Sequence, residues 1–470
     1  MSMGAGLPDR PGISGAPRIV HLGLGAFFRA FGCTYLADLG GWGVIGVSLR
    51  SPEIRDRLKP QECVYTACEL GPDGISDRVI DVVRDVLVAP EDPGAVVAAL
   101  AAPETTLVTL TVTEKGYCHD PATGALNLSH PDIGHDIGSP LPRTAPGFLV
   151  RGLQARRDAG LPPFTVLSCD NLSENGAVTK GIVLTLAREI APDLADWIAA
   201  EGAFPSSMVD RIVPATTAND VAALAARSGH QDAAPVMHEP FRQWVIEDNF
   251  VGARPALETV GAQLVADVRP FEHMKLRMLN GAHSSLAYLG CLAGHQTVAE
   301  AVADPVLAAY LRHLWQNEII PTLEAPPGTD LSAYADALLT RFANPGIRHR
   351  THQIAMDGSQ KLPQRLLGTI ADGLDAGRDM TGLLLAVAGW MRYTAGTDTQ
   401  GNAFTVNDPL AARLAEAHAG KDAAAIVADV LSIRAVFDPA LADRLRPALT
   451  ALYEGLTDKG ASAMMVEVVG

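Results

Sequence analysis

The stretch Arg18-Ile-Val-His-Leu-Gly23-Leu-Gly25-Ala-Phe-Phe-Arg29-Ala decides how the first half of this 470-residue chain is interpreted. It predicts a short apolar strand, a glycine-rich turn and the start of a helix. Such a turn lets backbone N–H groups and a helix N-terminus approach a pyrophosphate, because glycine has no side chain in the way. Phe28 stands where the full Gly-x-Gly-x-x-Gly pattern has its third glycine, so an ordinary tight turn is the alternative. The residues expected to contact a dinucleotide here are Gly23, Leu24, Gly25, Ala26 and Phe27.

Around this turn, apolar β-branched runs alternate with helical patterns up to about residue 265. We expect strands at 19–22, 44–49, 79–88, 107–112 and 165–168, and helices at 93–101, 146–158 and 178–190. This alternation predicts a mostly parallel, doubly wound α/β sheet of the Rossmann type.

From about residue 270 onward, helical periodicity takes over. The expected helices are 298–315, 331–342, 361–376, 380–394, 409–419, 423–432 and 439–456. We therefore expect a dinucleotide-binding Rossmann-type domain over residues 1–268 and a mostly α-helical domain, carrying substrate and catalytic residues, over residues 269–470.

Composition and charge indicate a globular protein and disfavour a polyanionic partner. Apolar residues make up 48% and charged residues 19%, and a chain of this length allows two or three domains with large cores. The formal net charge of -16 disfavours nucleic acid or an anionic membrane as a partner. The six cysteines form no Cys-x-x-Cys pair, and neither a basic leader nor a run of eighteen apolar residues occurs. Reduced thiols and a cytoplasmic location are expected.

The stretch Lys275-Leu-Arg-Met-Leu-Asn280-Gly-Ala-His283 places an amine, an amide and an imidazole within about two turns of an expected helix. At roughly 100° per residue, Lys275 and Asn280 are separated by about 140°, and His283 falls between them. One helix face would then carry a proton-transfer group and two hydrogen-bonding groups. The alternative is a lysine and a histidine on a solvated face.

This set of side chains suits the oxidation of a secondary alcohol by hydride transfer to a nicotinamide. That reaction leaves a hydroxyl proton to remove and negative charge developing on the oxygen. A lysine accepts such a proton near neutral pH when burial or nearby cations lower its pKa. Asn280 and Asn171 could donate hydrogen bonds to the oxyanion, and His283 could orient the hydroxyl. We expect no metal site, because the chain has no His-Glu-x-x-His motif and no paired cysteine spacing.

Further motifs accompany these two stretches. They are Thr113-Glu-Lys-Gly-Tyr117, Asp170-Asn171-Leu-Ser-Glu-Asn175-Gly176, Phe204-Pro-Ser-Ser-Met-Val-Asp210-Arg211-Ile, Glu247-Asp248-Asn249-Phe250 and Asp357-Gly-Ser-Gln-Lys361. On these motifs the chain resembles the polyol-specific long-chain dehydrogenases over nearly its whole length. The combination of Lys-x4-Asn-x2-His with Asp-Asn-x-x-x-Asn-Gly is highly specific.

The resemblance implies a metal-independent mechanism with Lys275 as general base and acid. Within it, Asn171 and Asn280 form an oxyanion hole, and the Asp170–Asn171 segment faces the nicotinamide and the substrate. For Asp170, Asn175 and Gly176, turn chemistry at a strand end is the alternative.

Asp210 borders the substrate site by the same resemblance. Its neighbour Arg211 could instead form an ordinary ion pair with it. Tyr117 and Trp244 are expected to be core or rim aromatics rather than substrate contacts.

The substrate class follows from a departure within the resemblance. Mannitol-type members carry an arginine eight residues before the lysine of their Asp-Gly-Ser-x-Lys motif, whereas this chain has Gln353. An amide in place of a bidentate cation changes which polar groups of a substrate are matched. The segment 348–361 instead resembles hexuronate-type members, and its cations suit a sugar acid carboxylate, although a solvated turn is the alternative. The expected substrate contacts here are Arg348, Arg350, Gln353 and Lys361.

The cofactor is expected to be NAD, with NADP not excluded. A typical NAD site has an acidic residue at the end of the second strand, to bind the ribose hydroxyls. Here the sequence after that strand is Arg50-Ser51-Pro52-Glu53, so Arg50 comes first and could accommodate a 2′-phosphate. The resemblance to hexuronate-type members favours NAD.

Together with these residues, the resemblance implies an NAD-dependent oxidoreductase that interconverts D-mannonate and D-fructuronate. The alternatives are a dehydrogenase of mannitol or of another hexitol or hexonate, and, in a different class, a non-catalytic dinucleotide-binding regulator. The proton-transfer set disfavours the regulator, because a sensor needs only the cofactor pocket. The expected partner is a small sugar acid or polyol.

Overall fold

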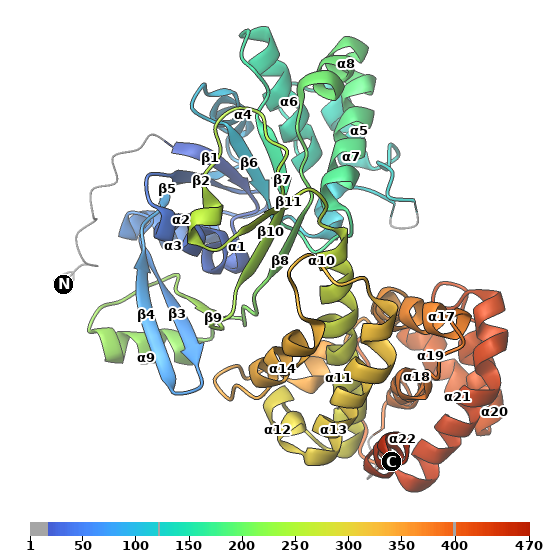
Figure 1. Ribbon diagram of the computed structural model, residues 1–470. Coiled ribbons are helices and arrows are strands. Elements are labelled where there is room, and N and C mark those ends of the chain that lie inside the picture. Colours follow the sequence, from blue (N-terminus) through green and yellow to red (C-terminus); the bar gives the residue numbers. More distant parts are fainter. Residues whose placement is uncertain (1–16, 121–122, 398–400) are drawn as a thin grey trace. The chain divides into compact units, whose positions relative to one another are not determined.

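The computed structural model describes residues 17–120, 123–397 and 401–470 (Figure 1). Its contacts divide the chain into two compact units, Met1–Arg269 and Pro270–Gly470. Each unit has its own architecture.

A five-stranded parallel sheet forms the centre of the first unit. Its strands, in spatial order, are β5 (Val83–Val88), β2 (Gly43–Ser48), β1 (Pro17–Leu22), β6 (Leu107–Leu110) and β7 (Thr165–Ser168). The strand order reverses at β1, which is the switch point at which Rossmann sheets bind dinucleotides. The predicted Rossmann-type doubly wound domain is confirmed.

Both faces of this sheet are buried, because successive side chains of a strand point to opposite faces. Ile19 packs into a core that α1 and α2 complete, whereas Val20 packs into a second core with α4, α6 and α7. The helices of this unit are α1 (Ala26–Ala30), α2 (Gly32–Leu39), α3 (Glu53–Leu58), α4 (Pro93–Ala101), α5 (Pro131–Gly138), α6 (Ala145–Asp158), α7 (Asn175–Ile190), α8 (Pro192–Glu201) and α9 (Ala218–Ser228).

Two small sheets accompany the parallel sheet, and the sequence analysis did not predict them. They are β4 (Gly74–Ile80), β3 (Tyr65–Gly71) and β9 (Val236–His238), and β11 (Gln263–Val265), β10 (Gln243–Glu247) and β8 (Ser207–Asp210).

The predicted single strand at 79–88 is wrong. Ile80 pairs with Tyr65 in the antiparallel β3–β4 hairpin, whereas Val83 pairs with Val44 in the parallel sheet. Only two residues separate the two strands. Because the apolar residues continue through both strands, the sequence pattern does not show that they belong to different sheets.

The second unit is mostly α-helical, as predicted. Its helices follow α10 (Arg269–Met274) and are α11 (Ala282–Ala293), α12 (Val298–Ala303), α13 (Pro305–His313), α14 (Leu331–Phe342), α15 (Thr351–Ala355), α16 (Gly358–Leu362), α17 (Gly368–Asp375), α18 (Thr381–Tyr393), α19 (Ala411–His418), α20 (Ala423–Leu431), α21 (Pro439–Lys459) and α22 (Ala461–Val469). Helix α11 is buried along its length and packs against α15 and α18.

Two long helices predicted in this unit are interrupted. The one expected at 298–315 stops at Asp304, whose side chain caps α13, and Pro305 begins that helix. The one expected at 361–376 contains the π-helical segment Pro363–Leu367 between α16 and α17.

A π-helical segment, Lys275–Gly281, also replaces the regular α-helix expected at 275–283. In a π-helix the backbone bonds join residues five apart rather than four. Lys275 and Asn280 therefore lie on consecutive turns, closer in angle than the expected 140°.

Candidate active site

The glycine-rich turn lies between β1 and α1, at the carboxyl end of the central strand. Gly23 has a φ of +91°, and a Cβ at this position would meet Thr111 O at 2.3 Å, so only glycine fits. Its N–H donates to Val47 O at 2.9 Å, which ties the turn to β2.

Gly25, two residues later, faces open space. It is exposed, and a Cβ there would have no neighbour nearer than Gly23 O at 3.7 Å. Gly25 precedes Ala26, the first residue of α1, and no side chain caps that helix. The backbone at Gly25 and the N-terminus of α1 are thus accessible to a phosphate, and the residues fit the pyrophosphate of a dinucleotide.

Phe28 explains the absence of the third glycine. Its ring is buried and stacks on the imidazole of His21, with ring centroids 3.5 Å apart. A Cβ at Gly32 would lie 2.3 Å from the Phe28 ring. Gly32 thus leaves room for the Phe28 ring, which stands at the position of the third glycine.

The end of β2 presents a cation. Arg50, two residues after Ser48, is exposed and has no ion-pair partner among the described residues. Glu53 begins α3 and is paired with Arg57 at 2.5 Å. The acidic residue here is thus engaged within its own helix.

Asp170 and Asn171 follow β7 at the same edge of the sheet as the glycine-rich turn. The buried Asp170 carboxylate accepts hydrogen bonds from the backbone N–H groups of Val112 and Thr113 and from the Tyr117 hydroxyl, at 2.8–2.9 Å. Burial raises the pKa of Asp170 above its ordinary value, although these three donors act in the opposite direction. Asp170 thus joins the ends of β6 and β7, while Asn171 is exposed beside it.

Asn175 and Gly176 anchor the loop that carries Asn171. The Asn175 side chain accepts from Ser207 N and donates to the carbonyls of Ser207 and Asp170, at 2.8–3.0 Å. A Cβ on Gly176 would lie 2.4 Å from Phe204 O, so glycine is needed for this close approach. Both residues act as supports, in line with the turn chemistry considered for this motif.

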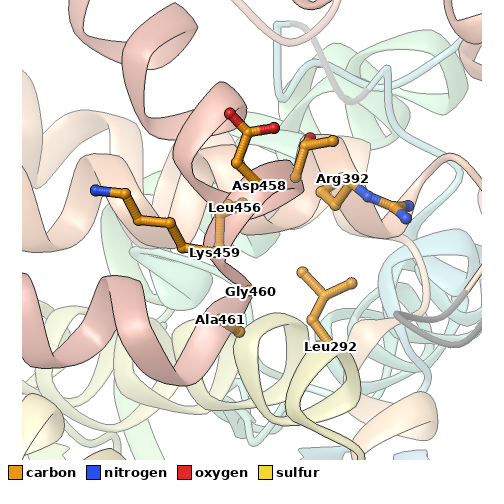
Figure 2. Close-up of a pocket in the computed structure, with 8 residues that line it drawn as sticks. Leu292, Arg392, Leu456, Asp458, Lys459, Gly460 and Ala461 are labelled. Atoms are coloured by element: carbon orange, nitrogen blue, oxygen red, sulfur yellow. The ribbon is translucent and has the colours of Figure 1, made fainter.

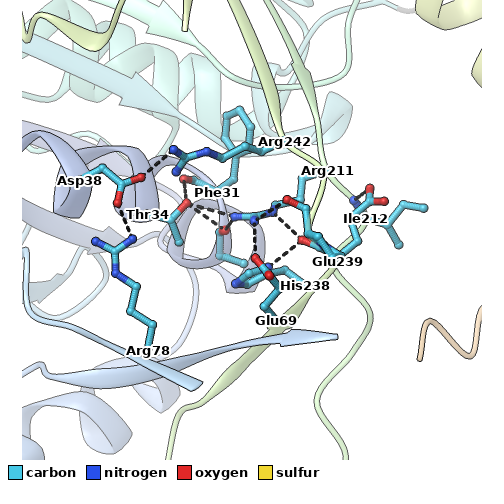
Figure 3. Close-up of polar contacts among 12 residues, drawn as sticks. Phe31, Thr34, Asp38, Glu69, Arg78, Arg211, Ile212, His238, Glu239 and Arg242 are labelled. Carbon is cyan, nitrogen blue, oxygen red and sulfur yellow. Dashed lines mark hydrogen bonds and ion pairs between the residues drawn. The ribbon is translucent and has the colours of Figure 1, made fainter. Parts of the chain in front are cut away.

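Asp210 is the buried last residue of β8. The guanidinium of the next residue, Arg211, forms an ion pair with Glu69 at 3.9 Å. The Arg211 guanidinium donates to Ala30 O at 2.7 Å and to Thr34 Oγ1 at 3.1 Å. Figure 3 shows Arg211 reaching Thr34. Arg211 thereby fixes the junction of α1 and α2, the two helices that follow the glycine-rich turn.

In the second unit, Lys275 and Asn280 are both half-buried on the π-helical segment. Gly281 follows, and a Cβ there would meet the backbone oxygen of Arg365 at 2.9 Å. The segments 275–281 and 363–367 pack against each other. The chain thus brings two π-helical segments into contact next to Lys275 and Asn280.

His283 is buried in the first turn of α11. Its ring stacks on Phe342 at a centroid distance of 4.4 Å and meets His349 edge-on at 5.8 Å. Burial, followed by the influence of His349 and Arg365, lowers the pKa of His283 well below 6.5. His283 is therefore neutral at physiological pH, and its Nε2 has no hydrogen-bond partner among the described residues.

The residues expected to contact a carboxylate differ in exposure. Arg348, Arg350 and Gln353 are exposed, and Arg350 directly precedes α15. Lys361 is half-buried in α16, and its amine donates to the carbonyls of Ile354 and Met356. Burial and the neighbouring Arg365 lower the pKa of Lys361.

Arg365 and two residues that neighbour His283 or Arg365 were not among the sequence-based candidates. They are Arg365, His349 and Tyr288. Arg365 follows Lys361 by four residues, a spacing that places side chains on one face of a helix, so this residue was within reach of the sequence analysis. The orientation of His349 toward His283 depends on tertiary packing and has no local signal.

A cavity of about 270 Å³ in the second unit lies elsewhere, at the junction of α21 and α22 (Figure 2). It is lined by Leu292, Arg392 and residues 456–461, none of which is a predicted site residue. Within the described parts of the chain, no three His, Cys, Asp or Glu side chains come together as a metal site, and no helix is long and apolar enough to cross a membrane.

Comparison with known proteins accounts for both units. The mannitol dehydrogenase Rossmann domain matches residues 17–259, and the mannitol dehydrogenase C-terminal domain matches residues 267–456. D-mannonate oxidoreductase of Escherichia coli (strain K12) is 48% identical over 458 residues, which cover 94% of each chain. A mannitol 2-dehydrogenase of Pyrenophora tritici-repentis is 41% identical over 95% of this chain and 81% of its own length.

A solved structure agrees with these sequence matches. The Pseudomonas fluorescens mannitol 2-dehydrogenase, in a ternary complex with NAD and D-mannitol, matches with a TM-score of 0.85 at 38% identity, over 97% of this chain and 94% of its own. Together with the Rossmann sheet and the glycine-rich turn, these matches define an oxidoreductase of the dinucleotide-binding class. The chain belongs to the mannitol dehydrogenase family, as its resemblance to the polyol-specific long-chain dehydrogenases predicted.

Proposed function

We propose that this protein is an NAD-dependent oxidoreductase that interconverts D-mannonate and D-fructuronate. The observation that carries the proposal is its 48% identity to a D-mannonate oxidoreductase along 94% of both chains. The cations of residues 348–365 support an anionic substrate, and Gln353 departs from the arginine of mannitol-type members.

NAD binds, in this proposal, at the carboxyl ends of β1, β2, β6 and β7. The open backbone at Gly25 receives the pyrophosphate, and the Asp170–Asn171 segment faces the nicotinamide. NAD supplies the hydride acceptor for a secondary alcohol when it is bound. The exposed Arg50 also suits the 2′-phosphate of NADP, so the preference for NAD rests on the relatives.

The proton chemistry is assigned to the π-helical segment. Lys275 takes the proton from the substrate hydroxyl during oxidation and returns it during reduction. Asn280, which shares its side of the segment, donates a hydrogen bond to the oxygen as negative charge develops there. We assign a second such donation to Asn171 of the first unit.

His283 orients the substrate hydroxyl in this proposal. Because its imidazole is buried and neutral, it donates through one ring nitrogen and accepts through the other. Asp210 and the segment 348–361 contact the remainder of the sugar acid.

Initial rates of cofactor oxidation test the assignment. D-fructuronate, D-tagaturonate and D-fructose are each reduced with NADH and with NADPH, at equal concentrations. We expect D-fructuronate with NADH to give the highest kcat/KM. A preference for fructose, or for mannitol in the reverse direction, would identify a hexitol dehydrogenase and contradict the proposed substrate.

A further inference from the structure

Arg365 has unused capacity to bind an anion. It lies in the π-helical segment Pro363–Leu367, and its guanidinium donates to Ser284 Oγ at 3.2 Å. A guanidinium has five N–H donors, and no carboxylate forms an ion pair with Arg365 among the described residues.

Arg277, on the neighbouring π-helical segment, shows the contrast. Its guanidinium donates to the carbonyl and to the hydroxyl oxygen of Thr322, each at 3.0 Å, and forms an ion pair with Asp372 at 2.5 Å. The protein thus satisfies Arg277 with its own acceptors. Arg365, although half-buried, lacks an equivalent carboxylate.

The surroundings of Arg365 add further donors without internal partners. His283 Nε2, His349 Nδ1 and the Tyr288 hydroxyl are buried atoms with no hydrogen bond to any described residue. His283 is only 7% exposed, so water cannot readily satisfy it from the surface. A buried polar atom without a partner is costly unless a ligand satisfies it.

Electrostatics in this group of residues also favour an anion. Besides burial, the charge of Arg365 lowers the pKa of Lys361 and of His283, and Lys361 lowers that of His349. Asp357 and Asp408 act in the opposite direction on Lys361. Asp408, however, accepts hydrogen bonds from the backbone and hydroxyl of Ser359, so it is already engaged.

Lys361 is a weaker candidate for the same anion. Its amine already donates to two backbone carbonyls, whereas the planar guanidinium of Arg365 can offer two parallel N–H groups to both oxygens of a carboxylate. The backbone of Arg365 also contacts the position next to Asn280, so its segment adjoins the proposed catalytic residues.

We propose that Arg365 is a specificity-determining residue that binds the carboxylate of the sugar acid, with His349 lining the same subsite. This inference rests on the proposed function, since it names the group that separates D-fructuronate from D-fructose. It assigns the charge recognition to position 365 rather than to position 361.

The test compares Arg365→Gln and Arg365→Lys with the parent enzyme, using D-fructuronate and D-fructose with NADH. We expect Arg365→Gln to raise KM for D-fructuronate roughly 10- to 100-fold, the effect of losing a charge-assisted contact, and to change kcat/KM for D-fructose by less than about twofold. Arg365→Lys should restore part of the affinity, because it keeps the charge but loses the bidentate geometry. Arg444→Gln, which removes an exposed cation paired with Asp375, is the matched control and should leave both substrates unchanged.

The outcomes separate this inference from the proposed function. A parent enzyme that prefers D-fructose overturns both. A parent enzyme that prefers D-fructuronate, with Arg365→Gln losing activity equally on both substrates or on neither, overturns the role of Arg365 alone. Thermal unfolding of each variant identifies a loss of folding. If Arg365→Gln does not fold, the test uses Arg365→Lys, for which the KM for D-fructuronate is compared with the KM for D-fructose.

Discussion

In the first unit, the groups assigned to the cofactor lie in turns at the carboxyl ends of parallel strands, whereas in the second unit the groups assigned to proton transfer lie on π-helical segments. The first arrangement depends on backbone geometry, as at Gly23, where a positive φ and a close approach to Thr111 exclude every side chain. The second depends on side chains such as Lys275 and Asn280, which an irregular helix brings to one side. Substitutions in the first unit should therefore affect cofactor binding or stability, whereas substitutions in the second should affect turnover.

The largest effect is expected at Lys275. Lys275→Met removes the proposed proton acceptor and should lower kcat at least about 10²-fold, the lower range for loss of general acid-base catalysis. The measurement is the steady-state rate with D-fructuronate and NADH. A variant that stays folded and keeps nearly full activity would show that Lys275 is not the catalytic base.

The glycines of the first unit provide a matched pair. Gly23→Ala puts a Cβ into Thr111 O at a positive φ, so it should lower the free energy of unfolding by at least about 1–2 kcal/mol. Gly25→Ala meets no such clash and should leave stability nearly unchanged, while raising KM for NADH roughly 10- to 100-fold by obstructing the charge-assisted contacts to the pyrophosphate. Urea unfolding and cofactor titration distinguish the two. Equal effects of both substitutions on stability would contradict the open space around Gly25.

A smaller effect is expected from buried histidines. Burial lowers the pKa of His21 in the first unit from 6.5 to about 3, and that of His418 in the second to about 4. Below pH 6.5 the unfolded chain binds more protons than the folded chain, so the stabilisation present above pH 6.5 is lost as the pH falls toward these values.

His21→Asn should therefore flatten the decline in stability, by about 1 kcal/mol between pH 7.5 and pH 5.5. His418→Gln should flatten it less, because His418 is half-buried and solvent screens it. Urea midpoints at pH 7.5, 6.5 and 5.5 provide the comparison. A steeper decline in His21→Asn than in the parent protein would contradict the neutral, buried state of His21.

The same contrast explains what the sequence could predict. The strand, turn and helix at residues 17–30 follow from local signals, and β7 and α4 have the expected bounds because apolar runs and an aspartate cap with proline mark them. The break between β4 and β5 was missed, since pairing partners far along the chain decide which sheet each strand joins.

In the second unit, the spacing of Lys275, Asn280 and His283 was visible, but a regular period of 3.6 residues gives no indication of a π-helical turn. Arg365 was not predicted because its proposed role depends on guanidinium N–H groups that lie beside His283 without a carboxylate partner. Only tertiary packing brings these groups together.

The division of roles between the units is tested most directly by titrating NADH into Lys275→Met and Gly25→Ala, with binding followed by cofactor fluorescence. We predict that Lys275→Met binds NADH as tightly as the parent protein but hardly turns over. Gly25→Ala should bind NADH more weakly, yet reduce D-fructuronate at nearly the parent rate once the cofactor is saturating. Loss of NADH binding in a folded Lys275→Met, or a Gly25→Ala variant that binds normally and fails in turnover, would contradict the account.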